Sequence, residues 1–345
     1  MQGKYYDGSR LLSQMDLYGR QPEIYICTTN RSAGKTTWFC RYLVKRFLEH
    51  NEKFGLLYRF DYELDDVADK FFKDIQGLFF PNYFMESKKK SRGMYHELFL
   101  DGNSCGYALA LNKADAIKKN SHLFSDVKRL YMDEFQSETN HYCSNEVQKL
   151  ISIHTSLARG ANEQVKRLPV YLVGNPVSII NPYYVELGIS DRLRSDTRFL
   201  KGDGFVLEQG FNEAASKAQE ESAFNRAFAG NKYAAYASQA AYLADNQAFI
   251  EKPEGSSRYL CTLRYMGNNY GIREYINDGI IYCDDRPDMT HPNKISVTTD
   301  DHEVNYVMLK RHDIFLSSLR YLFERGSFRF KNLRCKEAVL KALSY

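Results

Sequence analysis

The sequence has no long apolar run. No stretch approaches the roughly 18 apolar residues that a membrane-spanning helix needs. The opening residues, MQGKYYDGSR, also lack the apolar core of a signal peptide. We therefore expect a protein without a membrane partner that is made and used in the cytosol.

Clustered metal-binding or disulfide-forming residues are also lacking. The seven cysteines are scattered and form no C-x-x-C pair, and the eight histidines show no H-E-x-x-H spacing. Because disulfide scaffolds and zinc sites need tighter clusters, we expect reduced, buried thiols. The net charge is only +4, which does not demand a nucleic-acid partner but is compatible with a local basic patch.

The first part of the chain alternates apolar runs of strand length with amphipathic stretches of helix length. Strands that alternate with helices form a mainly parallel sheet covered on both faces, so this pattern predicts a three-layer α/β fold. The predicted strands are 23–28, 55–60, 127–135 and 168–176, and the predicted helices are 36–48, 63–76 and 145–159.

The composition changes near residue 210. Residues 214–248 contain 13 alanines in 35 positions and no proline, which predicts a helical segment. Short strands separated by Gly-Asn and Asn-Asp-Gly turns follow it, and two helical patterns end the chain. The predicted later elements are strands 258–266, 269–276 and 279–284 and helices 313–325 and 335–343. The predicted parts are an α/β domain over 1–205, a helical linker over 206–248 and a small α+β domain over 249–345.

The segment TNRSAGKT, Thr29–Thr36, lies between the first predicted strand and helix. In a phosphate-binding loop, backbone N–H groups and the helix N-terminus hold phosphate oxygens, a lysine reaches the β and γ phosphates, and a hydroxyl holds Mg²⁺. Lys35 and Thr36 stand at these positions, although Thr29 replaces the first glycine of the motif. The segment predicts that ATP and Mg²⁺ are bound by Asn30, Arg31, Ser32, Ala33, Gly34, Lys35, Thr36 and Thr37.

A second signature is the apolar strand that ends in Asp133 and Glu134. In P-loop ATPases such a strand lies beside the phosphate loop, where the aspartate enters the Mg²⁺ shell and the glutamate polarises the attacking water. A third strand ends at Asn175. Its side chain either senses the γ-phosphate or serves only the turn.

Four segments in this order, TNRSAGKT, RLYMDEF, SLARG and VYLVGNPVSIINPYY, together resemble the DNA packaging ATPases of small short-tailed phages of the picovirinae type. These motors also use a packaging RNA and are relatives of the large terminase subunits. The resemblance continues through residues 245–252 and 296–301 and covers nearly the whole chain. It is weakest in the alanine-rich stretch.

The resemblance implies a P-loop NTPase fold of the ASCE type and a motor that moves double-stranded viral DNA into a preformed prohead. It also implies a homo-oligomeric ring, a pentamer in this family, with ATP at the subunit interfaces and with portal and packaging RNA as partners. The protein would act in the host cell cytoplasm and, transiently, at the portal vertex of the prohead.

Residue roles follow from the same resemblance. Arg31 matches the arginine within the family's phosphate loop, and Asn175 matches the residue that couples hydrolysis to movement. Arg159, in SLARG, matches the arginine finger that a neighbouring subunit contributes. Lys118 or Lys119 would supply a second charge in trans, unless they are solvated loop lysines.

Basic clusters are the candidates for nucleic-acid contact. Lys88, Lys89, Lys90 and Arg92 form a charge run that either grips backbone phosphate or is a solvated face. Arg59 and Arg41 are weaker candidates. The basic residues of the tail would suit packaging RNA or DNA, and these are Lys310, Arg311, Arg320, Arg325, Arg329, Lys331, Arg334 and Lys336.

The C-terminal domain corresponds, by resemblance, to the RNase H-like nuclease of large terminases in a vestigial form. Two-metal nucleases need a central acid, and the strand RYLCTLRYM contains none, so we expect no nuclease activity. Two other functions remain open. One is a P-loop kinase or small-molecule NTPase, although residues 190–250 show no arginine-rich lid or nucleoside pocket. The other is a DNA-binding protein with an inactive loop, which Thr29 would suggest.

Overall fold

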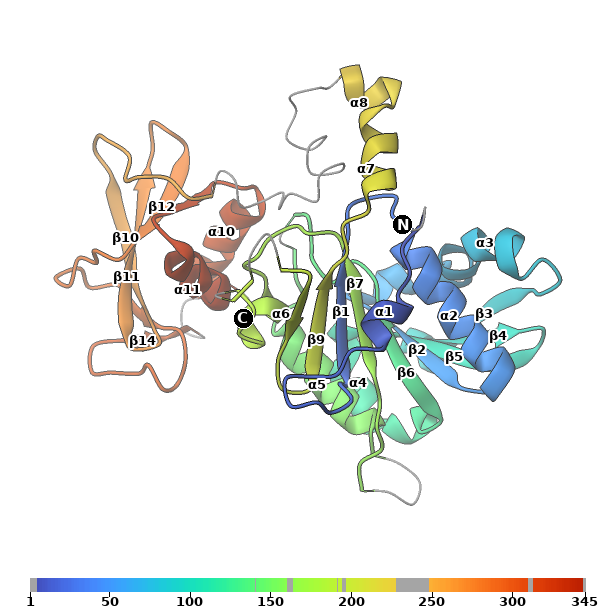
Figure 1. The fold of residues 1–345 in the computed structure, drawn as a ribbon. Coiled ribbons are helices and arrows are strands. Elements are labelled where there is room, and N and C mark those ends of the chain that lie inside the picture. The colour runs from blue at the N-terminus through green and yellow to red at the C-terminus, as the bar shows by residue number, and fades with distance from the viewer. Residues whose placement is uncertain are drawn as a thin grey trace. The chain divides into compact units, whose positions relative to one another are not determined.

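The computed structural model describes residues 5–139, 141–159, 164–190, 192–193, 197–227, 248–309 and 313–343 (Figure 1). The chain forms two compact units. The first contains residues 1–136, 146–176 and 192–241, and the second contains 137–145, 177–191 and 242–345. Within the described ranges, no helix is both long and apolar enough to cross a bilayer.

The first unit is built on a nine-stranded sheet with the order β3-β4-β5-β2-β6-β7-β1-β9-β8. Its six central strands, β5 to β9 in this order, run parallel, and antiparallel strands extend both edges. The strands are β1 (Ile24–Thr28), β2 (Lys53–Tyr58), β3 (Met85–Lys90), β4 (Tyr95–Leu100), β5 (Asn103–Ala110), β6 (Val127–Met132), β7 (Val170–Gly174), β8 (Phe199–Lys201) and β9 (Phe205–Gln209). The predicted, mainly parallel sheet is confirmed.

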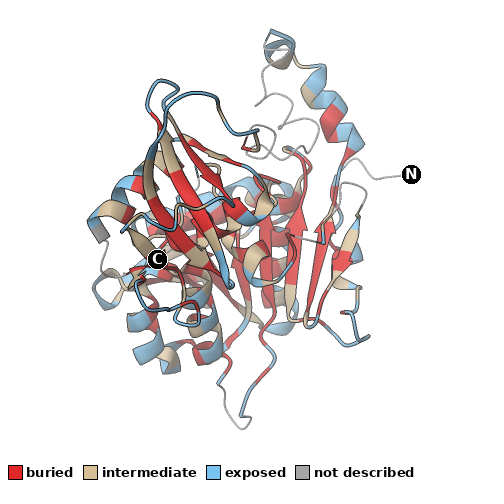
Figure 2. Cartoon of the chain, turned by 90° about the vertical axis from the view of Figure 1, so that its left-hand side faces the viewer, coloured by how far each residue is buried: buried red, intermediate tan, exposed pale blue. Residues whose placement is uncertain are grey.

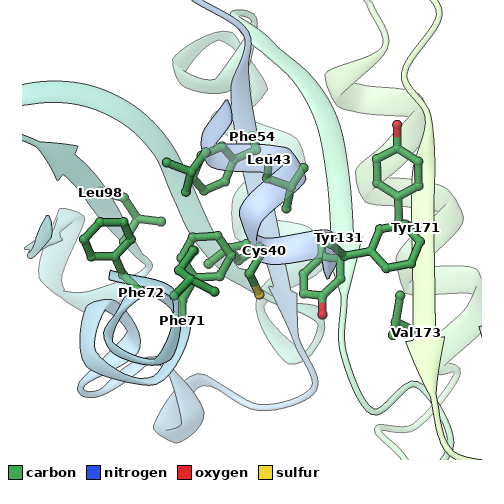
Figure 3. Close-up of a cluster of buried hydrophobic side chains, with 14 of the residues drawn as sticks. Cys40, Leu43, Phe54, Phe71, Phe72, Leu98, Tyr131, Tyr171 and Val173 are labelled. Atoms are coloured by element: carbon green, nitrogen blue, oxygen red, sulfur yellow. The ribbon is translucent and has the colours of Figure 1, made fainter. Parts of the chain in front are cut away.

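Helices cover both faces of this sheet, as expected for strands that are apolar throughout (Figure 1). Helix α2 packs one face with Phe39, Leu43 and Val44, in a core that also contains Phe54 and Tyr171 (Figure 3). In Figure 2, buried residues concentrate in the strands and exposed residues on the outer sides of the helices. The helices of this unit are α1 (Ser9–Leu12), α2 (Lys35–His50), α3 (Val67–Phe79), α4 (Ala114–Lys119), α5 (Glu146–Leu157), α7 (Glu213–Glu220) and α8 (Ala223–Ala227), with 3-10 turns η1 (Asp61–Leu64), η2 (Ser91–Gly93), η3 (Leu111–Lys113) and η4 (Ser121–Phe124).

The predicted first boundary, at residue 205, falls on the first residue of β9, so the sheet continues to Gln209. Helices α7 and α8 follow within the stretch predicted to be helical. The rest of that prediction, over residues 228–247, lies outside the described residues.

The second unit contains a six-stranded sheet with the order β14-β13-β10-β11-β12-β15. Strands β10, β11 and β12 form an antiparallel meander, and β13 and β15 join it in parallel to β10 and β12. Helix α11 packs on this sheet with Ala338 and Val339 in the core. The elements are β10 (Arg258–Tyr265), β11 (Asn268–Tyr275), β12 (Ile280–Asp284), β13 (Lys294–Ser296), β14 (Val307–Met308), β15 (Phe328–Phe330), α6 (Pro182–Glu186), α10 (Asp313–Glu324) and α11 (Leu333–Leu343).

Candidate functional site

The loop between β1 and α2 has the backbone shape of an anion-binding turn. Gly34 precedes α2 with φ +89°, a left-handed conformation that favours glycine. Its carbonyl accepts the first helical hydrogen bond, from the Trp38 N–H at 2.9 Å. Ser32 is also left-handed, with φ +61°, which is uncommon for a residue with a side chain. Left-handed turns of this kind turn successive N–H groups toward one point, where an anion binds.

Thr29, which replaces the motif's first glycine, does not need the conformational freedom of glycine. It is buried, and it is absent from the residues with positive φ. Its N–H donates to the Gly174 carbonyl at 3.3 Å, so it ties the loop to the end of β7. The next residue, Asn30, exchanges two hydrogen bonds of 2.9 and 3.0 Å with the backbone of Asn212. The loop is therefore anchored on both sides.

Lys35 lies among the other predicted residues. Its Nζ donates to Asn175 Oδ1 at 2.6 Å, and the side chain is buried. Burial lowers the pKa of Lys35, while the nearby carboxylates of Asp133 and Glu134 oppose that shift and Arg31 adds to it. The structure thus brings together the loop, the acidic turn and Asn175.

One detail of the prediction was wrong. The acidic strand β6 does not lie next to the loop strand β1, because β7 separates them. Neighbouring strands are about 4.8 Å apart, so the intervening strand opens about 10 Å between loop and acids. That spacing leaves room for a phosphate and a metal ion, and it places Asn175, at the end of β7, between them.

The acidic turn after β6 has an unusual backbone. The half-buried Asp133 accepts the Glu134 N–H at 2.9 Å. Glu134 is exposed and left-handed, with φ +52°. A non-glycine residue in this conformation carries strain, which clusters at functional sites. Asp133 and the exposed Thr36 hydroxyl supply the oxygen ligands that Mg²⁺ prefers, and Mg²⁺ takes few protein ligands beside phosphate and water.

A cavity of about 290 Å³ lies on the other side of the loop strand, toward β9. Tyr5 and Phe211 are its partly exposed aromatic side chains, at 64% and 42% exposure. Tyr5 is the side chain nearest Gly34, and the Tyr6 N–H donates to the Ala33 carbonyl at 2.8 Å. The full lining is Tyr5, Tyr6, Asp7, Arg10, Arg198, Glu208, Gly210, Phe211 and Asn212.

Sequence reasoning missed this cavity, and it found no nucleoside pocket in 190–250. The walls come from two segments about 200 positions apart, which only the pairing of β1 with β9 brings together. Glu208 forms the polar floor. It is buried, accepts the Tyr6 hydroxyl at 2.8 Å, and has a pKa raised by burial. The sequence offered little signal, because the strand that carries Glu208, β9, was not among the predicted strands.

Arg159 is exposed and lies two residues beyond the end of α5. The Lys166 N–H donates to the Ala158 carbonyl, and Lys166 Nζ donates to the Val127 carbonyl at the start of β6. Arg159 therefore lies near the amino edge of the sheet, whereas the phosphate loop lies at the carboxyl edge. The five residues of β7 span about 16 Å between these edges. Lys118 and Lys119, at the end of α4, also precede β6.

The predicted DNA-gripping residues form a hairpin at the sheet edge. Lys88 pairs with Glu86 at 2.9 Å, Lys90 pairs with Glu97 at 3.3 Å, and Lys89 lies 3.7 Å from Asp65. Arg92 occupies the left-handed tip between β3 and β4. Lysines on an edge strand also prevent the pairing of sheets from two molecules.

The weaker candidates are placed differently. Arg41 lies over the Phe79 ring, at 4.3 Å from its centroid. Arg59 is only 10% exposed and pairs with Glu146, so it is not a surface residue.

The acids of the second unit serve structural contacts. Asp284 is buried and lies 3.4 Å from Arg273, and Asp301 accepts the Gly267 N–H at 2.9 Å. In the tail, Lys331 pairs with Asp285, while the buried Lys336 donates to Ser178. Lys310 and Arg311 lie outside the described residues.

The order β6-β7-β1 and the lysine after a left-handed glycine define the class, a P-loop NTPase fold of the ASCE type. The model of the podovirus DNA encapsidation protein (Gp16) family matches residues 2–343. The chain belongs to this family.

Relatives and solved structures agree with this assignment. The DNA packaging protein of Bacillus phage phi29 is 26% identical over 306 residues, which cover 88% of this chain and 87% of the relative. That of Bacillus phage B103 is also 26% identical, over 88% and 90%. Two structures share the fold. The phi29 viral genome packaging motor assembly has a TM-score of 0.56 at 23% identity, covering 99% and 98% of the two chains. The Phi-28 gp11 DNA packaging motor has a TM-score of 0.59 at 17% identity, with the same coverage.

Proposed function

We propose that this protein is an ATP-driven motor that moves double-stranded viral DNA into a preformed prohead. Family membership supports the DNA packaging role. One structural observation carries the ATPase activity: the buried Lys35 lies at the carboxyl edge of the sheet with Asn175 and the two acids of the β6 turn. Convergence of these groups on an anchored loop also argues against an inactive loop.

The proposed reaction uses each of these groups once. The N–H groups of residues 30–37 and the N-terminus of α2 hold the phosphates, with Lys35 between the β and γ groups. Arg31 adds positive charge at the same loop. Thr36 and Asp133 would hold Mg²⁺, which supplies charge neutralisation when bound. Glu134 orients and deprotonates the attacking water.

The strand order supports one direction for the bound nucleotide. The acids follow β6, on one side of the loop strand, and the aromatic cavity lies on the β9 side. With the γ-phosphate toward Glu134, the ribose and base extend toward the cavity. We propose that Tyr5 and Phe211 stack on the base.

The position of Arg159 supports a ring. It lies near the amino edge of the sheet, and the length of β7, about 16 Å, separates that edge from the one with the phosphate loop, so it would complete the site of a neighbouring subunit. We propose a homo-oligomeric ring, a pentamer in this family, that acts on the portal with packaging RNA in the host cytoplasm. Lys118 or Lys119 would reach the same interface, and the Lys88–Arg92 hairpin would contact backbone phosphate.

The test is the rate of ATP hydrolysis by the full chain, alone and with double-stranded DNA and proheads. We expect DNA and proheads together to raise the rate, and Glu134→Gln to abolish hydrolysis while ATP still binds. A rate indifferent to DNA and proheads would overturn the motor. Full activity in Glu134→Gln would overturn the assigned base.

A further inference from the structure

We infer that Arg59 is a positioning residue that holds Glu134 in its left-handed, reactive conformation. Arg59 follows β2, the strand beside β6 on the side away from β7. Its Nη2 donates to the Phe135 carbonyl at 2.9 Å and approaches the Glu134 carbonyl at 3.4 Å. Its Nε donates to Glu146 Oε2 at 2.7 Å. This inference rests on the proposed function, because it assigns Glu134 as the base.

The contacts use the planar geometry of the guanidinium. Its Nε meets a carboxylate and its Nη2 meets two successive carbonyls, which an ammonium group on a flexible stem cannot do with the same fixed directions. Arg59 and Glu146 side chains are 10% and 1% exposed. Because buried charges are screened little by water, breaking one partner leaves the other uncompensated. The ion pair therefore holds the guanidinium in place, and its Nη2 in turn holds the carbonyls of the turn.

Arg59 contacts two parts of the first unit that are separated in the sequence by a short segment of the second unit. The chain leaves the first unit at Gln136, passes through residues 137–145, and returns at Glu146. Arg59 contacts both ends of this excursion. Glu146 also begins α5, which leads toward Arg159. The same side chain thus orients the turn of the proposed base and the start of the helix that leads to the proposed finger.

Glu134 has reason to need such a partner. Its left-handed backbone is unfavourable for a residue with a side chain, and its carboxylate is exposed. With Arg59 removed, the turn is free to relax and the carboxylate to move away from the attacking water. A displacement of about 1 Å can lower a rate by about 100-fold.

The experiment compares Arg59→Gln, Arg59→Lys and Glu146→Gln in the full chain. We expect kcat for ATP to fall by about 10–100-fold in Arg59→Gln, while KM stays within about threefold because the phosphate loop is untouched. Arg59→Lys should recover thermal stability but not kcat.

Arg129→Gln is the matched control. Arg129 is a half-buried arginine on β6, 14% exposed, which pairs with Glu52 at 2.6 Å and donates to the Tyr171 hydroxyl at 2.7 Å. It lies toward the amino end of the strand, away from the loop. This variant should lower stability and leave kcat nearly unchanged. An equal fall in kcat in Arg129→Gln would overturn the positioning role.

Hydrogen exchange separates this inference from the proposed function. We expect the amides of residues 134–136 to exchange faster in Arg59→Gln than in the wild type or Arg129→Gln, whether or not ATP is hydrolysed. If the wild type hydrolyses ATP and Arg59→Gln does so at the same rate, only the role of Arg59 is refuted. A wild type without hydrolysis refutes the proposed function, and unchanged exchange then refutes the positioning as well.

Discussion

At the scale of the residue, Phe211 tests the proposed binding site for the base of ATP. Phe211→Ala removes one of the two exposed rings of the cavity next to the phosphate loop. Stacking on a base contributes about 1–3 kcal/mol, so we expect KM for ATP to rise by about 5–150-fold. Inorganic tripolyphosphate has no base, and its inhibition constant should not change.

Phe84→Ala serves as the control, because Phe84 is also exposed, at 64%, but lies outside the cavity. It should leave KM unchanged. If Phe211→Ala weakens the binding of ATP and tripolyphosphate equally, the Phe211 side chain supports the phosphate loop and does not stack on the base of ATP.

The residues with direct chemical roles were the easiest to predict. Lys35, Asp133 and Asn175 each follow or begin an element with a clear apolar pattern, and the carboxyl ends of parallel strands meet at one edge. Thr29 could not be judged in this way. Whether a position requires glycine depends on its φ, and only the structure shows that Thr29 avoids positive φ. The partners of Arg59 are unpredictable for a similar reason, because two are carbonyls.

At the scale of the element, Glu52 joins the end of α2 to β6. It pairs with Arg46 and Arg129, each at 2.6 Å, and hydrogen bonds from Arg46 help to lower its pKa from 4.5 to about 2. A carboxyl with a lowered pKa stabilises the fold above its unfolded pKa and loses that contribution as pH falls toward its folded pKa.

We therefore expect Glu52→Gln to lower the free energy of unfolding by about 1–3 kcal/mol at pH 7, discounted for partial exposure. The difference from wild type should shrink between about pH 4.5 and pH 2, as measured by denaturant unfolding. Glu49→Gln is the control, since Glu49 is 48% exposed and its ion pairs, with Lys45 and His50, lie at the surface. A constant difference across this pH range would contradict the ion-pair explanation.

The β3–β4 hairpin is the element that tests DNA contact. Surface ion pairs contribute at most about 1 kcal/mol, so a DNA phosphate can replace their carboxylates. Lys89 and Arg92 have the weakest carboxylate contacts of the run, and we expect Lys89→Gln/Arg92→Gln to reduce the salt slope of DNA binding by about 2.

Lys88→Gln/Lys90→Gln should reduce that slope less, because Glu86 and Glu97 already pair with these lysines. Binding would be measured by titration across salt concentrations. Unchanged slopes in both variants would assign the lysines to protection of the sheet edge.

Some of the strands that sequence patterns predicted are buried along nearly their whole length. Strands β1, β6 and β7 read as apolar runs because helices cover them. Strand β3, with the sequence MESKKK, was interpreted only as a charge run. An edge strand has a polar side and one neighbour, so its pattern resembles that of a loop.

At the scale of the whole molecule, the two units are interleaved in the sequence. Residues 137–145 and 177–191 group with the second unit although both segments lie between elements of the first. A change in composition near residue 210 predicts a linker, but short segments such as 137–145 carry no compositional signal. The predicted division into three contiguous parts therefore describes the chain only in outline. Its helical linker stays a prediction, because residues 228–247 lie outside the described residues.

The last prediction concerns the ring. A site shared between subunits can be rebuilt from two variants that each lack a different residue of the site. Arg159→Ala keeps Glu134 and lacks the finger, whereas Glu134→Gln keeps the finger and lacks the base. In mixed rings at equal ratio, about a quarter of the interfaces join an intact Glu134 to an intact Arg159. An arginine finger contributes about 10³–10⁵ in rate, so these hybrid interfaces should dominate the activity.

We expect prohead-assembled mixtures to recover up to about a quarter of the wild-type ATPase rate if interfaces act independently, while each variant alone stays inactive. A mixture of Arg159→Ala with the Arg159→Ala/Glu134→Gln double variant contains no finger and should recover nothing. Because Arg159 lies at the sheet edge opposite its own phosphate loop, a finger acting within one chain would require a large rearrangement. If the mixed rings assemble fully but recover no hydrolysis, Arg159 is not the finger. Lys118 or Lys119 would then be the candidates for the charge supplied in trans.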